Sequence, residues 1–258
     1  MNYSLVFNLT RQDFSDRYAG SVFGLLWSFV HPLALISIYI VVFSKIMGSR
    51  LPGNSEVTNF SIYLVSGLLP WIAFSNTVSR ITTVFSDKKN IISKIKLKLS
   101  VLPSSLALSE SITFAISFTV FLFYYFSVVN FYIYPTFIAQ FFILFFLQQM
   151  FAIALGLIFA ILNVFFRDTK EFVSIFMNFW FWLTPIVWVP SIAPKWLNEL
   201  QDSINPASWI INGYRQIFVY SEGTSHTQLM VLFIFTFFLF ILSTRFLKIF
   251  EKDIRDLI

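Results

Sequence analysis

Five long stretches of the chain contain no Asp, Glu, Lys or Arg. They are residues 18–44, 57–79, 111–166, 172–194 and 223–244. A helix needs about 20 mainly apolar residues to cross roughly 30 Å of hydrocarbon, and each stretch is long enough. Only 12% of the residues are charged, whereas a soluble domain carries about 25%. The chain is therefore predicted to be an integral membrane protein, which excludes a soluble enzyme, a disordered chain and, without cysteine, a disulfide scaffold.

The third stretch is too long for one crossing. We expect it to break between Asn130 and Pro135, because proline cannot continue a helix interior without losing a hydrogen bond. The predicted fold class is an all-α integral membrane protein with a single transmembrane domain over residues 1–258. Its six predicted transmembrane helices are about residues 24–47, 60–82, 106–129, 135–166, 172–190 and 228–247.

Two segments outside the spans are also predicted to be helical. Residues 1–20 are expected to form an amphipathic helix on the membrane interface, with an ordinary cytoplasmic lead-in as the alternative. The side chains expected to face lipid are Leu5, Val6 and Leu9. Residues 191–227, between spans five and six, hold proline-bracketed pieces that predict short re-entrant helices and an outer gate. The candidate gate residues are Trp196, Asn205 and Pro206.

Basic residues near the span ends predict the orientation. With a cytoplasmic amino terminus, the inner segments hold 14 Lys and Arg residues and the outer segments hold four. Both termini are therefore expected in the cytoplasm. The net charge of +5 then reflects topology, so we expect contact with membrane lipids and set aside nucleic acid as a partner. The first residues lack the positive region of a cleaved signal peptide.

Residues for catalytic or metal chemistry are sparse. The chain has two histidines, His31 and His226, and no convergent set of metal ligands is suggested. A Ser–His–Asp arrangement would have to recruit one of these histidines from across the fold. No lysine follows a glycine, so the G-x-x-x-x-G-K phosphate loop is absent. We predict a protein that is not an enzyme, and any ATP that drives it must be bound by another chain.

Polar residues within the spans are mostly amides. The span centres contain no ionisable residue, which argues against a proton-coupled carrier. Arg80 and Glu110 lie near the inner ends of spans two and three, where we expect two separate interface residues, with an ion pair as the alternative. The amides expected to face other helices or a polar lumen are Asn76, Gln140, Gln148, Gln149, Asn163 and Asn178.

Aromatic residues make up 20% of the chain. Lipid contact or an interfacial belt explains most of them. A second interpretation is a lumen with aromatic faces, because sugar rings stack their C–H faces on aromatic rings, and a weakly binding wall lets a glycan slide. The candidate lining residues are Tyr39, Trp71, Trp180 and Trp182.

The inner connection between spans two and three predicts a short helix. Ser86 and Asp87 can cap it, and Asp87 would be favourable at its positive end. Such a helix suits docking to a partner protein, and a basic loop bound to anionic headgroups is the alternative. The residues concerned are Asp87, Lys88, Lys89, Asn90, Ile91 and Ile92.

Several motifs in order along the chain resemble those of a known family. They are Arg17-Tyr18-Ala19-Gly20-Ser21 with Leu25-Leu26-Trp27 and His31-Pro32, Phe166-Arg167-Asp168-Thr169, Trp182-Leu183-Thr184-Pro185-Ile186, Asn205-Pro206 and Gly213-Tyr214-Arg215. The chain resembles the ABC-2 type permeases that export polysaccharides, most of all those of O-antigen exporters, with teichoic acid permeases as near relatives. It departs from the family at Leu97-Lys98-Leu99, where members often carry a Phe-Pro-Arg-like triplet.

The resemblance implies a homodimer of permeases in the cytoplasmic (inner) membrane with two copies of a separate ATPase. ATP and Mg would be bound by that ATPase, and this chain would hold no cofactor. Asp87–Ile92 would be the coupling helix, and Arg17, Tyr18 and Trp27 would belong to the interface motif at the entry to the first span. Residues near Trp196 and Asn205 would form the periplasmic gate. The implied substrate is a glycan linked to undecaprenyl diphosphate.

Three alternatives remain at this stage. The nearest is an ABC-2 exporter of teichoic acid, a small drug or a peptide. A membrane transferase acting on polyprenyl lipids should show clustered Asp, Glu or His at the membrane face, and an ion channel subunit should show a selectivity loop or a charged ring. Neither pattern is found in the sequence.

Overall fold

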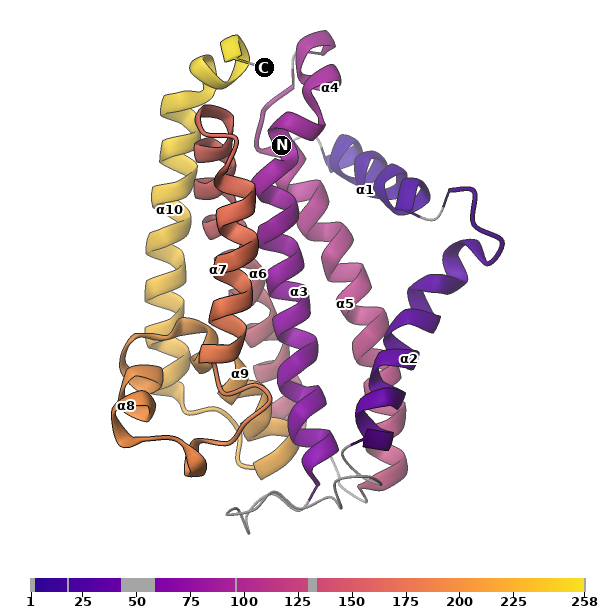
Figure 1. Ribbon diagram of the computed structural model, residues 1–258, viewed down its shortest axis with the longest axis vertical. Helices are drawn as coiled ribbons and strands as arrows, with labels where there is room; N and C mark the ends of the chain where they lie inside the picture. The colour runs from indigo at the N-terminus through magenta and orange to yellow at the C-terminus, as the bar shows by residue number, and fades with distance from the viewer. Residues whose placement is uncertain (1–2, 18, 43–58, 96, 130–133, 258) are drawn as a thin grey trace.

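The computed structural model describes residues 3–17, 19–42, 59–95, 97–129 and 134–257 (Figure 1). Every regular element within these ranges is a helix, which confirms the all-α prediction. Long helices run side by side as a bundle, and α1 (Tyr3–Arg17) lies obliquely against one side of it (Figure 1).

Within the described residues, four helices are long and apolar enough to cross a membrane. They are α3 (Phe60–Asp87), α5 (Val101–Val128), α6 (Pro135–Phe165) and α10 (His226–Leu257). These helices correspond to predicted spans two, three, four and six. Three of them, α3, α5 and α10, extend beyond the predicted span at the end of the bundle where α4 (Lys89–Lys94) lies.

The other two predicted spans are not confirmed. α2 (Trp27–Ile40) is a shorter apolar helix, and residues 43–47 of that predicted span lie outside the described residues. α7 (Thr169–Leu183) has 15 residues, so the continuous helix expected over residues 172–190 does not form. The cause is Pro185: the residue before a proline avoids the helical region, and Thr184 is extended with ψ 138°.

Short helices occupy the segment between α7 and α10, as predicted. They are η3 (Pro190–Ile192), α8 (Lys195–Ile204), α9 (Pro206–Arg215) and the π-helical turn η4 (Gln216–Tyr220). They lie at the end of the bundle opposite α4 (Figure 1). Their re-entry into the outer leaflet stays a prediction.

α6 packs against α3 on one side and against α10 on another. Gly156 of α6 allows the close approach to α3, because a Cβ atom there would lie 2.8 Å from Cβ of Ile81. Pro70 interrupts the hydrogen bonding of α3, and Gln148 of α6 donates from Nε2 to the Pro70 carbonyl at 3.2 Å. A buried amide of α6 therefore bonds directly to the α3 backbone at the proline.

Buried apolar side chains at the α4 end form a cluster that includes Ile81, Leu102 and Ile254. α1 joins this cluster, since Val6 is buried and its neighbours Leu5 and Leu9 pack against it. The helix predicted for residues 1–20 is thus present, but the expected lipid contact of Val6 is wrong, because packing on protein removes its apolar surface from water. Leu5 and Leu9 are only half-buried, so their lipid contact stays a prediction.

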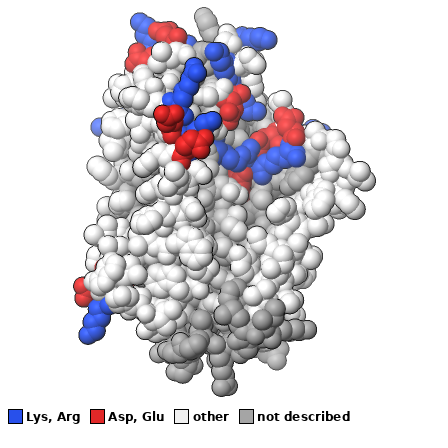
Figure 2. All heavy atoms as spheres, in the orientation of Figure 1, with Lys and Arg blue, Asp and Glu red and all other residues white. Residues whose placement is uncertain are grey.

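Charged residues gather at the end of the molecule that carries α1 and α4 (Figure 2). A wide band without charge follows on the visible face, and a small charged group lies beyond it, toward α8. Such an uncharged band is what a hydrocarbon layer requires, because an unpaired charge within it costs several kcal/mol.

Candidate transport and coupling sites

Four charged side chains meet where α1, α3 and α5 converge. Arg17 of α1 donates to Glu110 of α5 at 2.5 Å and to Asp13 of α1 at 3.2 Å. Arg80 of α3 donates to Glu110 at 2.7 Å and also pairs with Asp13. Ser109 adds a hydroxyl donor to Asp13 at 2.5 Å. Two cations and two anions balance in a closed group, which we call the ion ring, and it joins three helices.

The acidic members of the ion ring are buried. The Glu110 side chain is 2% exposed and that of Asp13 is 11% exposed. A buried carboxylate is stable only when it is paired and hydrogen-bonded, so the ring holds together as a unit. The expectation of two separate interface residues at Arg80 and Glu110 is therefore wrong, and the alternative ion pair is present. Sequence reasoning missed Asp13, although its spacing of four residues from Arg17 was a usable signal.

The interface motif is divided between two helices. Arg17 ends α1 within the ion ring, Tyr18 lies outside the described residues, and Trp27 begins α2. The Trp27 ring meets Phe23 edge-on, with centroids 5.7 Å apart. The structure therefore assigns Arg17 a pairing role and leaves Trp27, 39% exposed, on the outer surface of α2.

The predicted docking segment lies at the junction of α3 and α4. Asp87 is the last residue of α3, and the exposed residues Lys89 and Asn90 begin α4. Ile91 is half-buried, and Ile92 is buried in the apolar cluster at the α4 end. The short helix is thus anchored by its apolar side and presents its polar side outward.

The cap of this short helix differs from the prediction. Oδ2 of Asp87 accepts a hydrogen bond from Oγ1 of Thr83 at 2.6 Å, within α3. Lys88 is the residue before α4, and no side chain caps the helix. The predicted capping by Asp87 is therefore wrong, because α3 continues about one turn further than expected and Asp87 belongs to its last turn.

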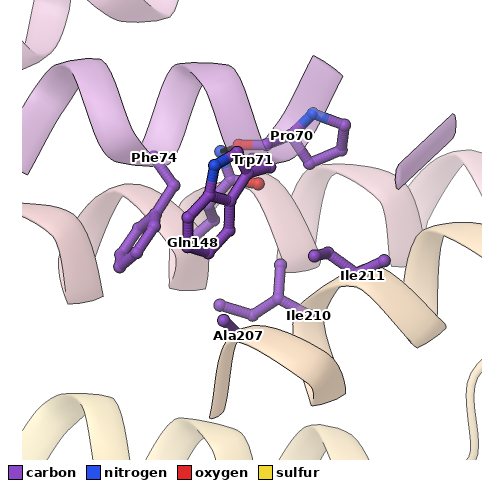
Figure 3. A pocket seen from close by; sticks show the side chains of 7 residues that line it. All are labelled: Pro70, Trp71, Phe74, Gln148, Ala207, Ile210 and Ile211. Atoms are coloured by element: carbon purple, nitrogen blue, oxygen red, sulfur yellow. Dashed lines mark hydrogen bonds between the residues drawn. The ribbon is translucent and has the colours of Figure 1, made fainter. Parts of the chain in front are cut away.

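The four candidate lining residues fall in different environments. Trp71 of α3 is 5% exposed and meets Trp180 of α7 nearly perpendicularly, with ring centroids 5.9 Å apart. Figure 3 shows Trp71 beside Phe74 and Gln148 at a cavity of only about 10 Å³, which side chains of α9 close. Trp182 is 61% exposed, and Tyr39 on α2 is half-buried.

Two of the exposed uncharged surfaces carry predicted lining residues, and we call them the open faces. A cavity of about 400 Å³ is lined entirely by residues of α2, namely Trp27, Val30, His31, Ala34, Leu35, Ile38 and Tyr39. α7 exposes a stripe of large apolar side chains at helical spacing, namely Phe172, Ile175, Phe179 and Trp182.

Asn205 joins the end of α7 to α8 and α9. Its Oδ1 accepts from Nε1 of Trp180 at 2.9 Å and from the backbone N–H of Ala207 at 3.1 Å, so it caps α9. Its Nδ2 donates to Thr184 at 3.0 Å and to Gln201 at 2.6 Å. One buried amide thus links a predicted lining residue to the predicted gate, two sites that the sequence analysis kept apart.

The other two gate candidates lie on either side of Asn205. Pro206 is the first residue of α9, where its fixed φ suits a helix start. Trp196 of α8 is 64% exposed. A cavity of about 210 Å³ lies between α7 and this corner, and Trp180, Asn205 and Pro206 line it.

Arg215 is a buried cation that sequence reasoning missed. It is 1% exposed at the end of α9, and its guanidinium carbon lies 3.6 Å from the centre of the Tyr63 ring. It donates to the carbonyls of Pro185 at 2.5 Å, Ile186 at 2.9 Å and Tyr63 at 3.4 Å. Desolvation lowers the pKa of Arg215, but arginine stays protonated in proteins. The residue fastens α9 to α3 and to the segment after α7.

The predicted amides divide into two groups. Gln140 exchanges hydrogen bonds with the backbone of Thr224, and Gln148, Gln149 and Asn163 reach α3. Asn178 is exposed, and Asn76 is exposed as a residue but its side chain hydrogen-bonds Glu110 of α5.

In the described part of the chain, four helices are long and apolar enough to cross a membrane, which defines a multi-pass helical membrane protein. The family described as "ABC-2 type transporter" matches residues 4–219, and the chain belongs to it. A relative named O-antigen export system permease protein RfbA, from Myxococcus xanthus, is 29% identical over 83% of this chain and 80% of its own length. Two relatives of the same name from Klebsiella pneumoniae are 29% and 28% identical, each over 97% of this chain and 92% of its own length.

Proposed function

We propose that this chain is the permease subunit of an ATP-driven exporter that moves an O-antigen-like polysaccharide, linked to undecaprenyl diphosphate, across the cytoplasmic membrane. The observation that carries the proposal is the similarity over 97% of the chain to proteins named as O-antigen export permeases. On this proposal two copies form a homodimer, both termini are cytoplasmic, and two copies of a separate ATPase bind ATP and Mg. The chain itself needs no cofactor.

The ion ring supports a transmission role for α1, α3 and α4. α4 follows α3 directly, and α3 carries Arg80, which holds both acidic members of the ring. A push on α4 by the ATPase would therefore move α3 and α1 together, because separating buried paired charges costs several kcal/mol. We assign Asp87–Ile92 as the docking segment on this ground.

The two open faces support a path for sugars at the homodimer interface. The α2 cavity and the α7 stripe are aromatic and uncharged, and they offer stacking surface without a deep binding minimum. Tyr39 and Trp182 would touch the glycan directly. Trp180 would act through Asn205 on the gate, and Trp71 would support Trp180 from behind.

Deleting the gene for this chain in its own organism tests the proposal. The expected result is loss of the glycan at the cell surface with accumulation of the lipid-linked glycan inside, since synthesis continues without export. Re-expression should restore display. Unchanged surface display in the deletion strain would show that the chain serves another substrate.

A further inference from the structure

We propose that the chain binds the phosphate group of a membrane lipid in a polar cavity at the α4 end of the bundle. The cavity has a volume of about 260 Å³ and lies between the end of α3, the α6–α7 junction and the end of α10. It is separate from the ion ring and from the α2 cavity, and it borders the α7 stripe at Phe172. The proposal stands whatever substrate the permease exports.

Three cations reach this cavity from different segments. Lys89 comes from α4, Arg167 from the α6–α7 junction and Lys170 from α7. Within the described part of the chain, neither Lys89 nor Arg167 has an ion-pair partner, and Lys170 makes only a loose exposed pair with Glu171 at 3.8 Å. Asp87 is the one carboxylate in the lining, so the cavity carries an excess of positive charge. Basic pockets between helices on the cytoplasmic side are typical sites for lipid headgroups.

Asn163 supplies a buried polar group to the same cavity. It is 5% exposed, its Nδ2 donates to Ser86 at a long 3.4 Å, and its Oδ1 has no partner. An unpartnered buried polar atom is costly. Nδ2 reaches Ser86, which is another lining residue, so its second N–H lies on the cavity side of the amide. A phosphate oxygen would meet this amide donor as well as three cations, which suits a charge-assisted site.

The surroundings of the cavity favour a lipid over a soluble anion or an acidic peptide. Phe166 precedes Arg167 and is 67% exposed, and Phe172, one turn into α7, is 58% exposed. These rings offer acyl chains an apolar surface beside the cationic group. A lipid is the ligand that presents a phosphate and a hydrocarbon tail together.

The test titrates the full-length permease, purified in detergent, with lipid and counts bound molecules by native mass spectrometry. The probes are short-chain phosphatidylglycerol, a polyprenyl diphosphate, diacylglycerol without phosphate, and inorganic phosphate. The variant is the double substitution R167Q/K170Q, and its matched control is R245Q/K248Q, which removes one exposed arginine and one exposed lysine from the end of α10. We expect roughly tenfold weaker binding of lipid phosphate in the first variant and less than about twofold in the control.

Each outcome decides the proposal. The proposal is supported if phosphatidylglycerol or the polyprenyl diphosphate binds more tightly than diacylglycerol and inorganic phosphate do. The tighter of these two lipids identifies the headgroup. Equal weakening in both double variants, or equal binding of diacylglycerol, overturns the proposal. If inorganic phosphate binds as tightly as lipid, the lipid assignment is overturned. If R167Q/K170Q binds lipid normally but no longer co-purifies with the ATPase, the cavity is a protein contact and the proposal is also overturned. If R167Q/K170Q does not fold, N163D is tested instead. Its side chain has nearly the same volume, and its carboxylate should weaken lipid binding because it repels phosphate. Unchanged lipid affinity in N163D would contradict the proposed site.

Discussion

Arg215 carries a full positive charge without a carboxylate partner among the described residues. Three main-chain carbonyls and the face of the Tyr63 ring surround it instead. Gly67 leaves the space, because a Cβ atom there would lie 3.0 Å from an Arg215 terminal nitrogen. Dipoles and a π face can balance a buried cation when the geometry is fixed, and a planar guanidinium supplies that geometry better than a lysine does.

We predict that Arg215→Leu strongly destabilises the protein. Carbonyls left without a donor cost about 1–3 kcal/mol each, so the loss in the free energy of unfolding should be about 3 kcal/mol or more. Denaturant unfolding of the detergent-purified chain measures it. Lys195→Leu, at an exposed cation in the same part of the molecule, is the control and should stay within about 0.5 kcal/mol. Equal unfolding midpoints for the two variants would contradict the role given to Arg215.

The sequence predicted the short helices around Asn205-Pro206, because an amide before a proline is a common helix start, and their role as a gate stays a prediction. Other residues could not be predicted. Arg215 was counted as an outer basic residue and as part of the motif Gly213-Tyr214-Arg215, but its burial could not be predicted, since its acceptors are backbone carbonyls that no residue type reveals. Trp71 and Trp182 looked alike in sequence, and only packing makes one buried and the other exposed.

At the scale of elements, hydropathy and length decided what could be predicted. The spans α3, α5, α6 and α10 follow from long uncharged runs, because a bilayer demands about 20 apolar residues. The end of α7 was not predicted, because it depends on a single proline inside such a run, where hydropathy gives no signal. The ion ring joins residues far apart in sequence, so a single chain's pattern suggested only the candidate pair Arg80 and Glu110.

We predict that Arg80→Gln releases α1 from the bundle. Glu110 and Asp13 would each lose a cation, and breaking one side of a buried pair costs about 3–5 kcal/mol. The chain has no cysteine, so a Val6→Cys reporter would be its only thiol, buried at 7% exposure. Maleimide labelling of that thiol should become several-fold faster with Arg80→Gln and stay unchanged with Arg11→Gln, an exposed cation of α1. Equal rates in both backgrounds would show that the ring does not hold α1.

A second element-level prediction concerns α4. Lys88 and Asn90 lie outside the lining of the lipid-phosphate cavity, so K88E/N90E changes the proposed docking surface alone. We expect insertion and folding to persist, because neither residue is buried, and glycan export to fall about tenfold with ATP hydrolysis no longer stimulated by substrate. The control K248E/K252E reverses the charge of two exposed lysines on α10. Normal surface display in K88E/N90E cells would remove α4 from the coupling scheme.

For the whole molecule, the 14 to four division of basic residues predicts the orientation. Ser93 of α4 and Ser203 of α8 are both exposed and lie at opposite ends of the bundle. A single Ser203→Cys substitution should therefore react with a membrane-impermeant maleimide in cells whose cytoplasmic membrane is intact and whose outer layers admit the reagent. Ser93→Cys should react only after lysis. The reverse pattern would invert the topology and, with it, the place of the ATPase.

The proposed transport path is also a matter for the whole molecule, because it runs along the exposed aromatic faces of both α2 and α7. We predict that Y39L/W182L slows glycan export about tenfold, since each aromatic contact is worth about 0.5–1.5 kcal/mol. Y39F/W182F keeps the rings and should retain most export. Phe238→Leu, at a ring 66% exposed on α10, tests general loss of aromatic surface toward lipid and should have little effect. Surface display after a pulse of glycan synthesis measures the rate, and assembly with the ATPase is checked by co-purification. Leucine and phenylalanine variants that export equally would mean that stacking does not guide the glycan, and the open faces would then be dimer contacts alone.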